Sequence, residues 1–202
     1  NNLRQEKDFT GVIFCDQNCR LIGFGKKLDQ LSKKHISSII KGDESFQNRK
    51  SKYYDYTVIH QPENLKLRKL YVFKLKKYKD YSIRDFQILG GHLQSIIKFY
   101  KEEKIIIYPD GIISSKVSFM NSVGELVLGM KLSSYEFNKY HTKNDSRNKS
   151  KKKIKIHSVQ YSRILKNSEK IDAISEGVKL TRDLVTEPPN FMTPPQIAEN
   201  AK

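Results

Sequence analysis

Cysteine is scarce in this 202-residue sequence, which contains Cys15, Cys19 and no other cysteine. A single pair separated by three residues cannot build the disulfide framework of a small secreted domain, nor the four-ligand set of a structural zinc site. We therefore expect two ordinary reduced thiols. The sequence also lacks an apolar leader and any run of about 18 apolar residues, which excludes a helical membrane span and favours a soluble intracellular protein.

Motifs for catalysis and metal binding are absent as well. The sequence has no His-Glu-x-x-His, no Gly-x-Ser-x-Gly, and no histidine pair at metal-ligand spacing. Gly23-Phe24-Gly25 lacks the later glycine of a dinucleotide-binding loop and predicts a turn. We expect no catalytic, cofactor-binding or metal-ligating residue, although groups that meet only in the folded chain leave no motif. The five histidines are expected to be ordinary surface or core residues: His35, His60, His92, His141 and His157.

Acidic residues are few relative to basic ones, with 22 Asp and Glu against 38 Lys and Arg and a formal net charge of +16. We expect a first basic cluster on the solvent side of a strand and its exit, and a second in a mobile loop over residues 138–153. Solvated surface of this kind predicts weak, sequence-independent DNA binding, and a dedicated nucleic-acid site is the alternative. The first cluster comprises Lys66, Arg68, Lys69, Lys74, Lys76, Lys77 and Lys79, and the second Lys143, Arg147, Lys149, Lys151, Lys152, Lys153 and Lys155.

Apolar residues alternate between two periodicities along the chain, and this predicts an α/β fold with a largely buried sheet. Runs rich in Val, Ile, Tyr and Phe predict strands at residues 12–15, 54–59, 67–75, 105–108 and 154–159. Apolar residues at helical spacing predict helices over residues 28–40, 85–100, 119–130 and 168–187.

Gly90 and Gly91 lie inside one of these predicted helices. Glycine costs a helix about 1 kcal/mol relative to alanine, so the pair needs a compensating reason. We interpret it as a site of close packing against another backbone.

A proline-rich bend follows the last long helix. Pro188 and Pro189 lack the backbone N–H that the helix would need, so the helix should close at Glu187. Thr193 followed by Pro194 predicts an N-cap with proline at the first helical position, and a new helix begins there. The sequence has no initial Met and stops within this helix, so we expect a piece of a longer protein.

Two segments resemble one known family. Residues 180–190, Leu-Thr-Arg-Asp-Leu-Val-Thr-Glu-Pro-Pro-Asn, with Thr-Pro-Pro-Gln-Ile-Ala at 193–198, closely resemble the interdomain junction of the leucyl (cytosol) aminopeptidase family. Residues 126–143, with Tyr135, Phe137 and Tyr140 in a Tyr-x-Phe-x-x-Tyr pattern, resemble an upstream segment of the same family. One departure is Thr186, where relatives usually carry Asn.

The resemblance implies an architecture of two parts. Residues 1–165 should form the N-terminal α/β domain, a mixed sheet sandwiched by helices and similar to macro domains. Residues 166–202 should form a long interdomain helix and the truncated start of the catalytic domain.

The resemblance also implies a parent enzyme, a cytoplasmic homohexameric exopeptidase that removes N-terminal residues from peptides with two divalent metals, zinc or manganese. Relatives carry the metal ligands around an Asn-Thr-Asp-Ala-Glu-Gly-Arg-Leu segment, and this chain contains no such segment. We therefore expect no cofactor and no aminopeptidase activity in this chain alone. A split or decayed gene product without catalysis is a further alternative.

Overall fold

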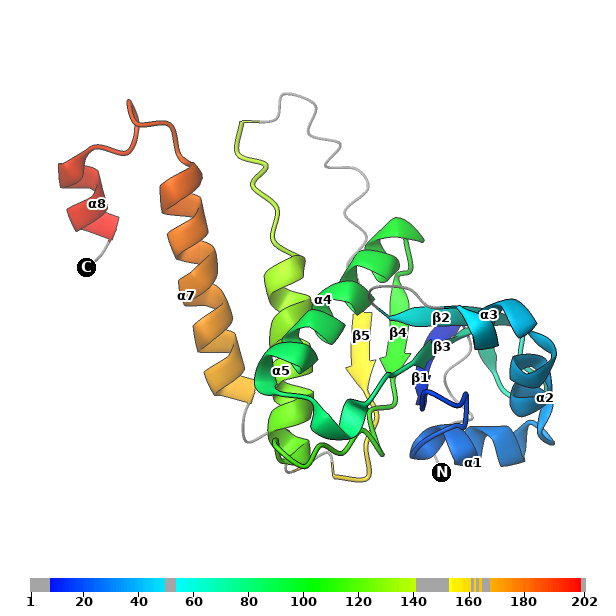
Figure 1. Cartoon of the computed structure of the whole chain (residues 1–202). Helices are drawn as coiled ribbons and strands as arrows, with labels where there is room; N and C mark the ends of the chain where they lie inside the picture. The colour runs from blue at the N-terminus through cyan, green and yellow to red at the C-terminus, as the bar shows by residue number, and fades with distance from the viewer. Residues whose placement is uncertain are drawn as a thin grey trace.

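The computed structural model describes residues 8–49, 54–140 and 153–200, except 161, 163 and 165–167. A five-stranded mixed sheet forms its centre, in the order β2-β3-β1-β4-β5 (Figure 1). β2 is antiparallel to β3, and the other neighbours are parallel. The five predicted strands are confirmed, although Val159 lies beyond the last of them. The strands are β1 (Phe9–Cys15), β2 (Asp55–His60), β3 (Leu67–Lys74), β4 (Lys104–Ile107) and β5 (Lys153–Ile156).

Helices cover both faces of the sheet. α1 (Phe24–Leu31), α2 (His35–Gly42) and α3 (Glu44–Asn48) cover one face, and α4 (Ile83–Phe99) and α5 (Phe119–Ser133) cover the other. Successive side chains of a strand point to opposite faces. In β1, Val12 and Phe14 accordingly pack with α4 and α5, while Ile13 and Cys15 pack with α1 to α3. This burial on both faces confirms the predicted α/β sandwich.

The single helix predicted over residues 28–40 is wrong. α1 ends at Leu31 and α2 begins at His35, because Lys33 and Lys34 adopt left-handed backbone angles with φ of 52° and 63°. Such angles interrupt the α-helical hydrogen-bond ladder. Asp29 holds the turn in place, since its Oδ1 accepts a hydrogen bond of 2.8 Å from the backbone N–H of Ser37.

The predicted start of α4 at Asp85 is two residues late. α4 begins at Ile83, and the Asp85 carboxylate accepts hydrogen bonds from the backbone N–H and the hydroxyl of Ser82, at 2.8 and 2.7 Å. Asp85, the third residue of α4, therefore closes a capping box with Ser82 as the N-cap.

Close packing against another backbone is confirmed at Gly90 but not at Gly91, where a Cβ atom would meet nothing closer than 3.7 Å. A Cβ atom on Gly90 would lie 1.9 Å from the carbonyl oxygen of Leu126 in α5. On the facing helix, a Cβ on Gly129 would lie 2.0 Å from the carbonyl oxygen of Gln87. The two helices therefore touch backbone to backbone at both positions, which only glycine permits.

The first basic cluster is predicted to face solvent, and this prediction is wrong for Lys74. Lys74 is only 3% exposed, because its ammonium caps the C-terminal end of α3 by donating to the carbonyl oxygens of Phe46 and Gln47. Arg68 and Lys69 both pair with the buried carboxylate of Glu102. Residues 141–152, which include most of the predicted basic loop and His141, lie outside the described residues.

α7 (Ser168–Thr186) packs along α5 and extends away from the sandwich, and α8 (Pro194–Asn200) follows after the bend (Figure 1). The predicted start of α8 at Pro194 is confirmed, and the backbone N–H of Ile197 donates to the carbonyl oxygen of Thr193 at 3.0 Å. α7 ends at Thr186, one residue before the predicted closing residue Glu187.

Within the described part of the chain, no helix is long and apolar enough to cross a bilayer.

Candidate functional site at the junction of α5 and α7

The segment that leaves α5 lies against the C-terminal half of α7. The hydroxyl of Tyr135 donates a 2.8 Å hydrogen bond to Oδ1 of Asp183. Arg182 donates from one guanidinium nitrogen to the carbonyl oxygen of Leu132 at 2.7 Å, and its guanidinium lies 5.4 Å from the centroid of the Tyr135 ring. Arg182 thus satisfies a carbonyl near the C-terminal end of α5, where a cation is also favoured by the helix dipole.

Glu187 receives two further contacts from the same segment. The ammonium of Lys139 pairs with one carboxylate oxygen, and the hydroxyl of Tyr140 donates to the other. These hydrogen bonds lower the pKa of Glu187 below its ordinary value, against a smaller opposing effect of burial. The Tyr140 ring also lies 6.0 Å from the ring of Phe191, beyond the two prolines. The residue that precedes Pro188 is therefore held from the side of the sandwich.

We call this set of contacts the clamp. It joins Tyr135, Lys139 and Tyr140 to Asp183 and Glu187, with partners 47 or 48 residues apart in sequence. The segment after α5 and the end of α7 are the two segments that stand out in the sequence. Sequence analysis identifies each of them separately, but no local signal indicates that they touch.

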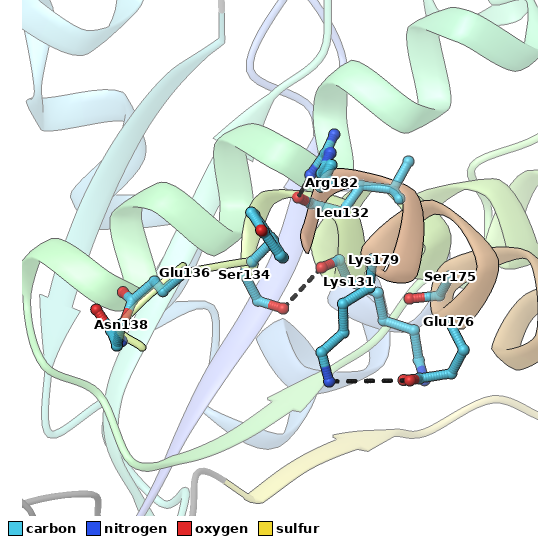
Figure 2. A pocket seen from close by; sticks show the side chains of 10 residues that line it. Lys131, Leu132, Ser134, Glu136, Asn138, Ser175, Glu176, Lys179 and Arg182 are labelled. Atoms are coloured by element: carbon cyan, nitrogen blue, oxygen red, sulfur yellow. Dashed lines mark hydrogen bonds and ion pairs between the residues drawn. The ribbon is translucent and has the colours of Figure 1, made fainter. Parts of the chain in front are cut away.

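A pocket of about 340 Å³ opens between α5 and α7 beside the clamp (Figure 2). Its charges are largely balanced: Lys179 lies 3.8 Å from Glu176, and Lys131 pairs with Asp172 at 2.6 Å. The described residues contain no group of three or more His, Cys, Asp or Glu that could hold a metal ion. The pocket therefore offers polar surface between two helices and no recognisable catalytic constellation.

The carboxyl end of the sheet is a second candidate position for a site. Open α/β sheets bind ligands there, at the point where the strand order reverses. Side chains fill this position. Phe24 stacks on Tyr108 with ring centroids 4.9 Å apart, and the ring of His157 lies 4.7 Å from Phe24. Gly23, predicted as part of a turn, precedes α1 with φ 51°, and a Cβ there would lie 1.3 Å from the carbonyl oxygen of Asp110. The turn prediction is confirmed, and the backbones close the crevice.

Comparison with known proteins agrees with the sequence resemblance. The model of the cytosol aminopeptidase family, N-terminal domain, matches residues 12–144. A probable cytosol aminopeptidase of Rhizobium leguminosarum bv. trifolii is 32% identical over 144 residues, which are 70% of this chain and 28% of that relative. One of Agrobacterium fabrum is 34% identical over 146 residues, again 70% of this chain and 28% of the relative. The chain thus spans under a third of the length of these relatives.

Solved structures support the same fold. A mutant of tomato leucine aminopeptidase superposes with a TM-score of 0.64 at 17% identity, over 100% of this chain and 40% of the tomato chain. The macrodomain of Mycobacterium tuberculosis DarG gives a TM-score of 0.50 at 10% identity, over 77% of this chain and 92% of the macrodomain. The expected likeness to macro domains is confirmed at the level of the fold. Together with the sequence matches, these findings show that the chain belongs to the cytosol aminopeptidase family and carries its N-terminal domain.

Proposed function

We propose that this chain is the non-catalytic N-terminal part of a metal-dependent exopeptidase that removes N-terminal residues from peptides. In this proposal residues 1–165 are a supporting domain, and residues 166–202 lead into a catalytic domain that binds two zinc or manganese ions. The family match and the names of the relatives support it. A cytoplasmic homohexamer, as the sequence resemblance implies, is part of the same proposal.

The observation that carries the proposal is the clamp. Glu187 is held immediately before Pro188 and Pro189, whose rings fix φ near −65° and stiffen the bend. Because α7 is held on one side of this bend and α8 begins on the other, the orientation of the sandwich is transmitted through the bend. The role that we propose for the domain is therefore to position the part of the enzyme that follows α8.

The 202-residue chain alone is expected to be inactive as an aminopeptidase. Its sequence contains no Asn-Thr-Asp-Ala-Glu-Gly-Arg-Leu segment, and the described residues hold no metal-ligand cluster. Incubation of the purified chain with Leu-p-nitroanilide and Mn²⁺ should release no p-nitroaniline above the buffer control. Metal-dependent turnover that copurifies with the chain would place the active site in these residues and overturn the proposal.

Loosening the clamp should free the end of α7. We expect Tyr140→Phe and Glu187→Gln to speed amide hydrogen exchange in residues 180–187, because each removes a hydrogen bond that holds Glu187. Acidification should likewise lower the protection of these amides, measured as their exchange rate relative to that of an unstructured chain at the same pH. The folded pKa of Glu187 is lowered, so its contribution is complete above the ordinary pKa of Glu and is lost as the pH falls through the folded pKa.

Glu176→Gln is the matched control for the clamp variants, since Glu176 is also on α7 and, within the described part of the chain, forms its ion pair with Lys179 of its own helix, at 3.8 Å. This variant should leave exchange at residues 180–187 unchanged. Equal exchange in wild type and both clamp variants would show that the clamp does not hold α7.

The nucleic-acid alternative receives less support from the first basic cluster than its composition suggests. Glu102 pairs with both Arg68 and Lys69 and offsets one of their two positive charges, and Lys74 is buried. We expect weak duplex DNA binding that is independent of sequence and falls steeply with salt. Fluorescence anisotropy across a salt series, with wild type and a Lys151→Ala, Lys152→Ala, Lys153→Ala variant, measures this. Tight sequence-selective binding at physiological salt would make the nucleic-acid role primary.

A further inference from the structure

α1, α2 and α3 lie on the other side of the sheet from α5 and α7 (Figure 1). A larger pocket is lined by residues of these helices and of the turn that follows β1. Its volume is about 480 Å³, within the range of ligand-binding pockets, roughly 300–1,000 Å³. We call it the α1–α2 pocket. Leu21, Ile40 and Cys19 supply apolar lining, and four exposed cationic residues also line it: Arg20, Lys26, Lys34 and Lys41.

Hydrogen bonds from side chains to the backbone fix the walls of this pocket. Asp16 Oδ1 accepts from the backbone N–H groups of Asn18 and Arg20, at 2.9 and 2.8 Å, and so shapes the turn that follows β1. The side-chain amide of Gln47 donates to the carbonyl oxygens of Ile40 and Lys41, at 3.1 and 2.6 Å. The Asp29 contact with Ser37 fixes the turn that carries Lys34. The pocket is therefore built into the α1 to α3 layer.

The charge of this pocket is not balanced, unlike that of the pocket beside the clamp. Among the described residues, none of the four cationic side chains makes an ion pair. Of the described residues that line the pocket, Asp29 alone is acidic, and its single negative charge cannot offset four cations. The pocket thus presents net positive charge around an apolar lining.

We propose that the α1–α2 pocket binds an acidic peptide segment that carries an aliphatic side chain. The aliphatic group would cover Leu21 and Ile40, and carboxylates would pair with the surrounding lysines and arginine. The described residues that line the pocket include no aromatic ring, so they offer no stacking surface of the kind that nucleic-acid bases use. A bare inorganic anion would leave the apolar lining uncovered. This inference does not rest on the proposed aminopeptidase function.

The test uses the 202-residue chain and a fluorescent peptide, Asp-Glu-Leu-Leu-Glu-Asp, acetylated at its N-terminus so that an aminopeptidase could not take it as a substrate. We expect saturable binding by fluorescence anisotropy. Lys26→Glu combined with Lys34→Glu should weaken it about tenfold or more, through lost and reversed ion pairs. Both changes place acidic residues at helix N-termini, which the helix dipole tolerates.

The control variant combines Lys66→Glu with Lys116→Glu, which changes the net charge equally at two exposed lysines outside the pocket. It should bind the peptide like wild type at 150 mM salt. Circular dichroism of both variants checks that they fold. An equal loss of peptide affinity in the two variants would overturn the proposal, because binding would then depend on the overall charge of the protein and not on the pocket.

Two further readouts separate the remaining outcomes. A peptide with both leucines replaced by serine, Asp-Glu-Ser-Ser-Glu-Asp, should bind distinctly more weakly than the leucine peptide. Equal affinity for the two peptides would overturn the aliphatic part of the proposal. Bound peptide should also slow alkylation of Cys19 by N-ethylmaleimide, located by mass spectrometry, because Cys19 lines the pocket whereas Cys15 is buried. Unchanged alkylation, or loss of duplex DNA binding in the pocket variant without any peptide binding, would contradict the assignment.

Discussion

Replacing Gly90 with alanine is expected to lower the free energy of unfolding by about 3 kcal/mol or more, at or beyond the upper end of ordinary overpacking. The new Cβ would lie 1.9 Å from the carbonyl oxygen and 2.8 Å from the carbonyl carbon of Leu126. Both are backbone atoms and cannot rotate away as a side chain can. α4 and α5 would have to separate, and the core between them and the sheet would open.

The neighbouring glycine provides the control. A Cβ on Gly91 would meet nothing closer than the Cβ of Ser133 at 3.7 Å, and one on Gly177 would meet nothing within 4 Å. Gly91→Ala and Gly177→Ala should therefore be neutral or stabilise the chain by up to about 1 kcal/mol, the gain in helix propensity. Urea unfolding followed by circular dichroism measures all three variants. Similar losses for Gly90→Ala and Gly91→Ala would show that the backbone contact is not the cause.

Replacing Lys74 with methionine should cost about 3–5 kcal/mol, the range seen when one partner of a buried ion pair is removed. The ammonium of Lys74 donates to the carbonyl oxygens of Phe46 and Gln47 and lies 3.8 Å from Oδ2 of Asp55, whose side chain is fully buried. Methionine fills a similar volume but leaves these carbonyl groups without their donor, and it leaves the Asp55 carboxylate with only the more exposed ammonium of Lys76 beside it, among the described residues. We expect α3 to detach from the sheet edge first.

Lys76→Met is the matched control, because Lys76 also faces Asp55, at 3.6 Å, but its side chain is 41% exposed. Its loss should cost less than about 1 kcal/mol, as for other exposed ion pairs. Adding Asp55→Asn to Lys74→Met should recover part of the stability, since the uncompensated buried charge is removed. Chemical denaturation of the single and double variants gives the coupling energy, and additive effects would contradict a direct interaction.

Local signals in the sequence predicted most of the fold. Strand periodicity located β1 to β5, and the cost of glycine inside a helix pointed to the contact at Gly90. The sequence does not predict the break at Lys33 and Lys34, because lysine carries no signal for left-handed backbone angles. A charged residue at the end of a strand is usually exposed, so the pattern predicts a solvent-exposed Lys74. The carbonyl groups that bury it come from a distant segment of the sequence.

The clamp shows a different limit on prediction from the sequence. The Tyr-x-Phe-x-x-Tyr segment and the end of α7 were each recognised from their resemblance to a family. Their contact joins residues 48 positions apart, and neither propensity nor periodicity carries information over that distance. The absence of a catalytic or metal role in these residues remains a prediction that the activity assay tests.

The position of the clamp along α7 has a mechanical consequence. α7 has 19 residues. At a rise of 1.5 Å per residue it is a rod of roughly 28 Å, so a tilt of about 5° at its base would sweep its tip through roughly 2.5 Å. Active-site geometry is sensitive to errors of about 1 Å. Contacts at the C-terminal end of α7, through Asp183 and Glu187, limit this displacement directly. Contacts at Ser168 alone would not limit it.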